Sequence, residues 1–339
     1  MGTHIPSSSV PLHGRRILVC LDRSAFSEVC LLYAISLTKT FGSAVTLAYV
    51  MEARHERTGP QASDALGWEI ARQEAKGYLE RLEKEVSQAL GQPVEVRLEQ
   101  GRPAERIVDL AREIEAEITV LGSRGEGCAP ASSLGRTAQQ ILASAHNSVF
   151  IAHSSSVAPA AAAPKRILVP LDGSIRTESV LPAAVRIASA HGAELLLVHV
   201  VQETLQTELL SAPEDMALAH TLTDRLESGA KRYLERLQRQ LEHRLAPNRT
   251  LVVRHANERQ CLLEISQREQ ADLIVISAHG YGCDSARSFG SVTTYLLTHS
   301  TVPLLVLQDL PGHDSPQANE VDGVHLTPPL RASYAPEHV

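Results

Sequence analysis

Residues 271–293 read ADLIVISAHGYGCDSARSFGSVT, an apolar run followed by a loop that contains glycine. The run at 271–276 predicts a strand, and the residues from Ser291 onward predict a helix. A strand that leads through such a loop into a helix favours anion binding, because the first N–H groups of the helix carry a partial positive charge. Backbone N–H groups near Gly280 and Gly290 can also turn toward an anion. The stretch therefore predicts a phosphate-binding loop.

The chain contains a second copy of this stretch. LGSRGEGCAPASSLGRTA at 121–138 lies 155 residues earlier and has the same pattern. The similarity extends further, because KRILVPLDGS at 165–174 restates RRILVCLD at 15–22, and YLERL occurs at both 78–82 and 233–237. A repeat of this length indicates duplication of a whole domain, since solenoid repeats run roughly 20 to 50 residues. The offset grows from 150 to 155 residues after the second strand, which predicts five inserted residues in a surface loop.

Each copy alternates predicted strands and helices. Apolar runs that are bounded by turn residues predict the strands of the first copy at 15–22, 43–50, 94–101, 117–122 and 148–153. Helices are expected between them, the first capped by Ser24 and ended by Gly42. Strands that are apolar on both faces are typical of a parallel sheet covered by helices. The order predicts an α/β, Rossmann-like domain with a doubly wound, open, five-stranded parallel sheet.

The chain divides into two domains and three connecting or terminal segments. The linker is rich in small residues and proline, and the tail lacks apolar periodicity, which predicts disorder. The expected segments are a flexible leader at 1–14, a first domain at 15–153, a linker at 154–164, a second domain at 165–309 and a disordered tail at 310–339.

Composition places the chain among globular proteins. It is 43% apolar and 21% charged, and its net charge is −7. A dedicated nucleic-acid or anionic-membrane binder needs a concentrated basic face, so neither partner is expected. No run reaches the length of a membrane span and the first residues lack a signal peptide, so a cytoplasmic location is expected.

The five cysteines show no CxxC pair and no metal-type spacing, so they are expected to be reduced thiols. Cys128 and Cys283 occupy equivalent places in the two glycine loops. They are either inert small loop residues or redox-sensitive thiols. His279 has no second ligand nearby in the sequence, and zinc needs three or four donors, so no metal site is expected.

One aspartate follows the first strand of each copy, Asp22 in the first and Asp172 in the second. Ligands of open parallel sheets lie beyond the carboxyl ends of the strands, where the winding reverses. If strands one and four are neighbours there, each copy places a carboxylate beside an anion loop. The carboxylate can accept hydrogen bonds from adenine or ribose while the loop binds phosphates. The alternative is that each aspartate only caps its own loop in an Asx turn.

With these motifs the chain resembles a tandem universal stress protein, in which two domains of the adenine-nucleotide-binding type share one polypeptide. The resemblance covers about 15–153 and 165–309. It implies the strand order 3-2-1-4-5 in each sheet. It also implies a pseudo-two-fold dimer of the two domains through their fifth strands, SVFIAH against PLLVLQ.

The nucleotide motif of that family is Gly, two residues, Gly, nine residues, Gly, then Ser or Thr. The first copy fits at Gly122, Gly125 and Gly135, but Arg136 replaces the hydroxyl residue. This arginine either binds phosphate bidentately, or fills the pocket and pairs with a carboxylate, which would make the first copy a structural pseudo-domain.

The second copy fits at Gly280, Gly290 and Ser291, but Ser277 replaces the first glycine. That serine would cost on the order of 1 kcal/mol if the position required a left-handed backbone. We expect the second copy to be the better site. The nucleotide-binding residues that the resemblance implies are Asp172, Val200, Ser277, Gly280, Gly290, Ser291, Val292 and Thr293, and more weakly Asp22, Val50, Gly122, Gly125, Gly135 and Arg136. The two valines are expected to line the adenine pocket.

Three functions follow as expectations. The first is a stress-response regulator that binds ATP or a related adenine nucleotide, with Mg²⁺ accompanying the phosphates, and signals through protein partners. The second is a scaffold whose two degenerate sites bind no nucleotide. The third is an enzyme that hydrolyses ATP slowly or activates a substrate as an adenylate. The sequence shows no HExxH, GxSxG or Walker motif, so no enzyme beyond weak ATP hydrolysis is expected. The chain is expected to be a monomer with an internal pseudo-dimer, or a homodimer.

Overall fold

The computed structural model describes residues 16–52, 65–125, 134–153, 162–203, 213–242, 247–281 and 288–308. The predicted leader and tail, most of the predicted linker, and Cys128 and Cys283 lie outside these residues. We call 16–153 the first half and 162–308 the second half.

The two halves repeat the same order of elements, except that one helix of the first half corresponds to two helices in the second. The first half contains β1 (Arg16–Leu21), α1 (Ala25–Phe41), β2 (Ala44–Met51), α2 (Ala65–Leu90), β3 (Glu95–Gln100), α3 (Pro103–Glu113), β4 (Ala116–Gly122), α4 (Arg136–Ser144) and β5 (Ser148–Ala152). The second half contains β6 (Arg166–Pro170), α5 (Ile175–Glu178), α6 (Leu181–His191), β7 (Glu194–Gln202), α7 (Pro213–Glu242), β8 (Asn248–His255), α8 (Glu258–Arg268), β9 (Leu273–Ser277), α9 (Ser291–His299) and β10 (Leu304–Leu307).

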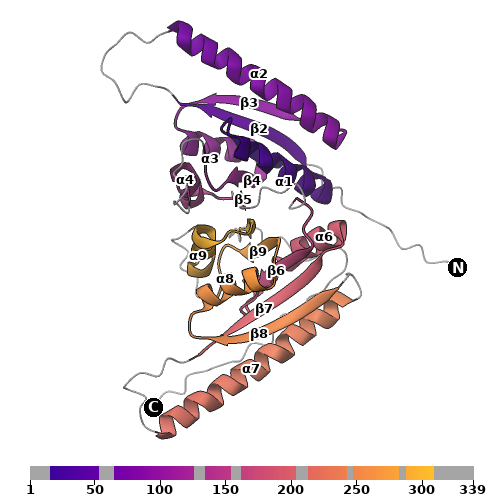
Figure 1. The fold of residues 1–339 in the computed structure, drawn as a ribbon, viewed down its shortest axis with the longest axis vertical. Coiled ribbons are helices and arrows are strands. Elements are labelled where there is room, and N and C mark those ends of the chain that lie inside the picture. The colour runs from indigo at the N-terminus through magenta and orange to yellow at the C-terminus, as the bar shows by residue number, and fades with distance from the viewer. Residues whose placement is uncertain are drawn as a thin grey trace, which may run out of the picture.

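The ten strands form one continuous sheet in the order β3-β2-β1-β4-β5-β10-β9-β6-β7-β8. Each half therefore has the predicted order 3-2-1-4-5, and its strands are parallel. The halves join where β5 and β10 pair antiparallel, with Leu305 opposite Phe150. We call this junction the seam. The predicted pairing of the fifth strands is confirmed, and it merges the two predicted sheets into one that runs the length of the molecule (Figure 1).

Two apolar layers sandwich the sheet. Helices α1, α2, α6 and α7 cover one face, and α3, α4, α8 and α9 cover the other. Each layer contains buried residues of both halves, such as Phe150 and Leu305 on the first face. The core therefore continues through the seam.

The turn after β1 is set by local sequence. Ser24 caps α1, because its hydroxyl accepts a hydrogen bond from the N–H of Ser27 at 3.0 Å. The helix ends at Gly42, whose φ of 65° suits glycine and whose N–H donates to the Thr38 carbonyl. Both predicted helix ends are confirmed. They fix where the chain leaves the carboxyl end of β1.

The second half departs from the first in two places. The counterpart of α1 is split into α5 and α6, since Pro182 has no N–H for the Glu178 carbonyl. The second departure is α7, which has 30 residues where α2 has 26. The loops that follow β2 and β7 lie mostly outside the described residues, so the predicted five-residue loop insertion stays a prediction.

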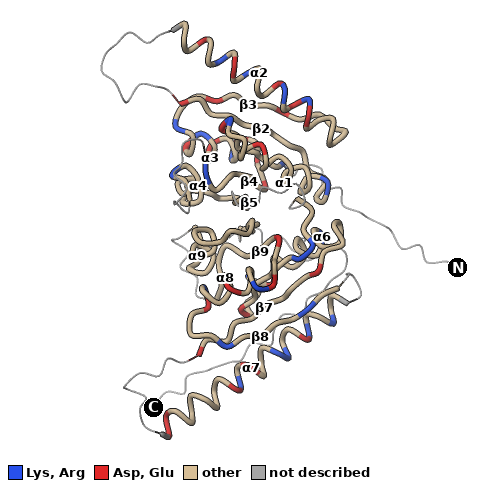
Figure 2. The backbone as a smooth tube through the Cα atoms, in the orientation of Figure 1, with Lys and Arg blue, Asp and Glu red and all other residues tan. Residues whose placement is uncertain are grey.

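The charged groups are dispersed over the described residues. Figure 2 shows blue and red positions alternating along α2 and α7, the outermost helices of the molecule. None of the helices in the described ranges combines the length and the hydropathy that a membrane crossing needs.

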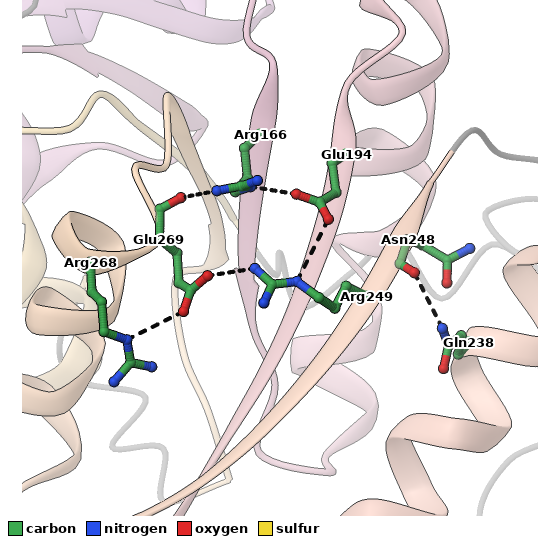
Figure 3. A network of polar contacts seen from close by, with 7 residues as sticks. All are labelled: Arg166, Glu194, Gln238, Asn248, Arg249, Arg268 and Glu269. Carbon is green, nitrogen blue, oxygen red and sulfur yellow. Dashed lines mark hydrogen bonds and ion pairs between the residues drawn. The ribbon is translucent and has the colours of Figure 1, made fainter.

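One ion-pair network lies at the amino ends of the second-half strands (Figure 3). Arg249 contacts Glu269 at 2.5 Å and Glu194 at 3.6 Å, and Arg166 contacts Glu194 as well. Because amino and carboxyl ends of parallel strands lie at opposite edges, this network is separate from the predicted site. It ties β6, β7 and β8 to the end of α8.

Candidate functional site

The structure brings each predicted aspartate beside its glycine loop. β1 pairs with β4, and β6 pairs with β9. Asp22 and Asp172 follow β1 and β6, and the loops follow β4 and β9. In both halves, the carboxylate and the loop therefore meet at the carboxyl edge of the sheet.

Asp172 accepts hydrogen bonds from three residues. Its Oδ1 accepts from the Ser174 N–H at 2.8 Å and the Thr177 hydroxyl at 2.7 Å. Its Oδ2 accepts from the Tyr281 N–H at 2.8 Å. Partial burial raises the pKa of Asp172, but these hydrogen bonds outweigh it and hold the pKa below its usual value. The carboxylate is therefore charged at neutral pH and ties the end of β6 to the glycine loop.

Asp22 orders the corresponding turn in the first half. Its Oδ1 accepts from the N–H of Ser24 at 3.0 Å and from the Ser24 hydroxyl at 2.5 Å. The bond to the N–H two residues ahead is an Asx turn, as in the second half. The alternative of a loop-capping aspartate thus describes a contact that is present in both halves, whatever else the carboxylate binds.

The second glycine of each motif gives the aspartate room. A Cβ on Gly280 would lie 2.6 Å from Asp172 Oδ2, and a Cβ on Gly125 would collide with Asp22 Oδ2. Neither glycine has a positive φ. The close approach of the carboxylate, rather than a left-handed backbone, excludes a side chain here.

The third glycine lies at the start of a helix. Gly290 precedes α9 and Gly135 precedes α4, both with a φ of −67°. A Cβ on Gly290 would meet nothing closer than the Ala278 carbonyl oxygen at 3.5 Å, which is an ordinary contact. Within the described residues, no protein atom therefore prevents a side chain at this position.

The first residues of α9 have different environments. Ser291 is exposed and Val292 is half-buried against the core. Thr293 is buried, and its hydroxyl donates to the Ser277 carbonyl at 2.9 Å. Thr293 therefore holds the end of β9, whereas Ser291 faces solvent at the helix N-terminus.

Arg136 is the first residue of α4 and is exposed. It forms no ion pair with another described residue. The second alternative, in which this arginine fills the pocket and pairs with a carboxylate, is therefore not seen in the part of the chain that the structure describes. Its charge lies at the N-terminal end of the helix.

Ser277 occupies its position without backbone strain. It is the last residue of β9 and is not among the residues of positive φ. Its hydroxyl donates to the His279 carbonyl at 2.6 Å. The condition for a left-handed penalty is therefore not met, because the position is ordinary strand.

The glycine at the matching position, Gly122, is required by a neighbour. A Cβ there would lie 2.7 Å from Cε1 of Phe26. The counterpart of Phe26 in the second half is Arg176, as the alignment of SAFSE at 24–28 with SIRTE at 174–178 shows. The two differences between the halves are therefore coupled. Gly122 occurs with Phe26 in the first half, and Ser277 occurs with Arg176 in the second. The alignment contained this signal, but sequence reasoning missed it.

Val50 and Val200 lie near the carboxyl ends of β2 and β7. Both are buried, on the face of the sheet that α3, α4, α8 and α9 cover. Their role in lining an adenine pocket stays a prediction.

Sequence reasoning also missed a polar pair at the end of β5. His153 is only 5% exposed, and its Nε2 has no hydrogen-bond partner among the described residues; nor does Nε of Arg124. Burial and the nearby Arg124 charge lower the pKa of His153 to about 4. This histidine is therefore neutral at pH 7. Its counterpart is Gln308, the residue after β10.

A partly buried polar cluster lies next to Asp172 in the second half. The His199 and Tyr233 rings meet edge to face at 6.3 Å, and Arg236 lies 3.6 Å from Glu178, which is 6% exposed. Burial raises the pKa of Glu178, although Tyr233 and Arg236 oppose the shift. The first half repeats the pattern with Tyr49, Tyr78, Arg81 and Glu28. His199 lies in this packed layer, against the Tyr233 ring.

A hollow of about 630 Å³ lies at the opposite, amino edge of the first half, between α3 and α4. Asn147 and Gln308 line it, together with apolar residues such as Ile107. It contains none of the predicted site residues. Within the described residues, no group of three or more His, Cys, Asp or Glu side chains could hold a metal ion.

Comparison with known proteins finds matches to both halves of the chain. The model of the universal stress protein family matches residues 14–153 and 164–308. A universal stress protein of Mycolicibacterium smegmatis is 26% identical over 298 residues, which cover 86% of this chain and 96% of that protein. One from Mycobacterium tuberculosis is 28% identical over 208 residues, or 60% of this chain and 65% of that protein.

Solved structures show the same fold. A universal stress protein from Archaeoglobus fulgidus aligns with a TM-score of 0.62 at 19% identity, covering 87% of this chain and 99% of that one. A Pseudomonas aeruginosa protein described as functionally unknown aligns with a TM-score of 0.59 at 14% identity, covering 88% and 93% of the two chains. With the family model matching both halves and a relative matching along nearly its whole length, this chain belongs to the universal stress protein family, as a tandem member with two such domains.

Proposed function

We propose that this chain is a stress-response regulator that binds ATP or a related adenine nucleotide, more tightly in its second half, and signals through protein partners. Its membership of the universal stress protein family supports the general role. The residues at the carboxyl edge support the ligand class. Catalysis is at most weak ATP hydrolysis in this proposal.

The observation that carries the proposal is the room at Gly290. This glycine begins α9, and a side chain there would make only ordinary contacts within the protein. No atom of the described residues therefore explains a glycine here, whereas a phosphate at the helix N-terminus would, because it must approach the first N–H groups closely. Asp172 lies at the same edge, tied to Tyr281 of the same loop. A charged acceptor and an anion-binding helix end are the two groups that a nucleotide needs.

Three features favour the second half. Ser291 offers an exposed hydroxyl where the first half has Arg136. Ser277 fits its strand without strain. In the first half, Phe26 lies against the end of β4 beside Gly122, whereas an exposed arginine takes its place in the second half. The second half therefore combines an exposed hydroxyl at the helix N-terminus with a less obstructed strand end.

The proposal is tested by direct measurement of bound nucleotide. Purified protein is denatured and the released small molecules are analysed by chromatography. A fluorescent ATP analogue is then titrated into the wild type, Gly290→Asp and Gly135→Asp, with and without Mg²⁺. We expect Gly290→Asp to abolish most of the binding, because it adds bulk and negative charge at the helix N-terminus.

Three outcomes would contradict the proposal. Absence of both released nucleotide and analogue binding would favour a ligand-free scaffold. Binding that Gly135→Asp abolishes and Gly290→Asp leaves intact would reverse the ranking of the two halves. A steady-state ATP turnover well above background would instead favour an enzyme.

A further inference from the structure

A hydrogen bond crosses the seam beside the second glycine loop. Ser288 lies two residues before Gly290, and its hydroxyl donates to the carbonyl of Ala143 at 2.7 Å. Ala143 belongs to α4, a helix of the first half. The segment that leads into the predicted phosphate end of the second site is thus held by the other half.

A second contact holds the same residue. The side-chain amide of Gln308 donates to the Ser288 carbonyl at 3.4 Å. Gln308 is itself fixed across the seam, because its N–H donates to the Ser148 hydroxyl at 3.2 Å. Ser288 therefore has one contact through its side chain and one through its backbone, and both lead to the first half.

The chemistry of the helix end explains the first contact. The last four carbonyls of a helix have no partner within the helix, and Ala143 carries one of them in α4. A hydroxyl is a suitable donor for such a carbonyl. On the other side of Ser288, Phe289 is buried in the core. The backbone that enters Gly290 is consequently set by one buried ring, by one hydrogen bond across the seam to α4, and by one hydrogen bond from Gln308.

We propose that α4 of the first half positions the phosphate end of the second site through Ser288, so that the second site is complete only when the first half is paired with it. This inference rests on the proposed nucleotide function. Ser288 is a positioning residue here, because it acts on the helix end at Gly290 and not on the ligand itself.

The expected size follows from the bond. A neutral hydrogen bond that is lost without leaving a buried orphan changes an equilibrium by about twofold to tenfold. Ser288 is half-buried and Ala143 is exposed, so water can hydrogen-bond to the Ala143 carbonyl when the Ser288 hydroxyl is removed. Removing the hydroxyl should therefore weaken nucleotide binding by about that factor while the fold stays intact.

The chain offers a matched control. Ser36 in α1 also makes a hydroxyl hydrogen bond across the seam, to Nε2 of His191 at 2.9 Å. Helices α1 and α6 cover the opposite face of the sheet from α4 and α9. Ser36→Ala therefore removes a comparable seam contact without touching the glycine loop.

The experiment uses the full chain in a Gly135→Asp background, so that the second site alone reports. A fluorescent ATP analogue is titrated into Ser288→Ala, Ser288→Thr and Ser36→Ala, and the thermal unfolding midpoint of each is recorded. We expect Ser288→Ala to raise the dissociation constant about twofold to tenfold, Ser288→Thr to restore it, and Ser36→Ala to leave it unchanged. The midpoints of the two alanine variants should agree.

The outcomes separate this inference from the proposed function. If the wild type binds no adenine nucleotide, both are overturned. If the wild type binds nucleotide but Ser288→Ala leaves the dissociation constant of the Gly135→Asp protein unchanged, only the positioning role is overturned. The same holds if Ser36→Ala raises that constant as much as Ser288→Ala does. A loss in Ser288→Ala that Ser288→Thr does not restore also contradicts it, because threonine keeps the hydroxyl.

Discussion

The replacement Gly280→Ala tests why the second glycine of the motif is needed. Its new Cβ would lie 2.6 Å from Asp172 Oδ2, so the carboxylate has to move away. The movement breaks the 2.8 Å hydrogen bond from the Tyr281 N–H. A hydrogen bond to a charged group contributes about 1.5 to 3 kcal/mol. Because Gly280 has no positive φ, alanine also gains about 0.5 kcal/mol by restricting the unfolded chain. The net expectation is a loss of about 1 to 2.5 kcal/mol.

The decisive measurement is a double-mutant cycle with Asp172→Ala. Urea unfolding at pH 7, followed by circular dichroism, gives the free energy of unfolding for each variant, and hydrogen exchange reports the Tyr281 amide. In the Asp172→Ala background the obstructing oxygen is absent, so Gly280→Ala should be neutral or slightly stabilising. Gly290→Ala is the control, because its Cβ makes only ordinary contacts, and its effect should not depend on Asp172. If Gly280→Ala costs the same in both backgrounds, the carboxylate does not explain the glycine.

Three further predictions concern the fold around the site. Gly122→Ala should destabilise the first half, because its Cβ would lie 2.7 Å from the Phe26 ring, and Phe26→Ala should relieve most of that loss in thermal unfolding. An equal loss in both backgrounds would exclude the clash. His153 has a pKa near 4, lowered by burial and by Arg124, against about 6.5 in the unfolded chain. The unfolded state therefore binds more protons between these values, and stability should fall by up to roughly 3 kcal/mol as pH drops from about 6.5 to 4. His153→Gln should flatten this part of the pH profile; an unchanged slope would assign it to other groups. Phe150→Ala should cost about 3 to 5 kcal/mol in urea unfolding, since its ring is fully buried beside the seam, and a loss below about 1 kcal/mol would mean that the core there is loosely packed.

Local signals in the sequence predicted the elements well. Ser24 and Gly42 bound α1 as expected, because a cap and a left-handed glycine act within one turn of the chain. The β5 and β10 pairing was also predicted, but only through the family resemblance. The split of the α1 counterpart could have been anticipated from Pro182, whose missing N–H interrupts any helix interior.

The contacts that define the site could not be predicted in the same way. Phe26 meets Gly122 and Asp172 meets Tyr281 across about a hundred residues of chain, so no local pattern encodes either contact. Motif matching assigned Gly280 to the ligand, whereas the structure shows that the neighbouring carboxylate already excludes a side chain there. Thr293 was predicted to bind nucleotide, yet its hydroxyl is engaged by the strand end. A motif shows which residue types occur at a given spacing, but it does not show which contact requires each residue.

The antiparallel seam between β5 and β10 has a consequence for how the two halves can change over time. When two identical chains associate through such a strand, every substitution appears on both sides of the axis. Here each side is encoded separately, so a phenylalanine and glycine on one side can coexist with an arginine and serine on the other. The covalent connection also raises the effective concentration of each half for the other, which favours this unequal pair over two equal ones. Because the two copies are joined in one chain, their sequences can differ at equivalent positions of the two sites.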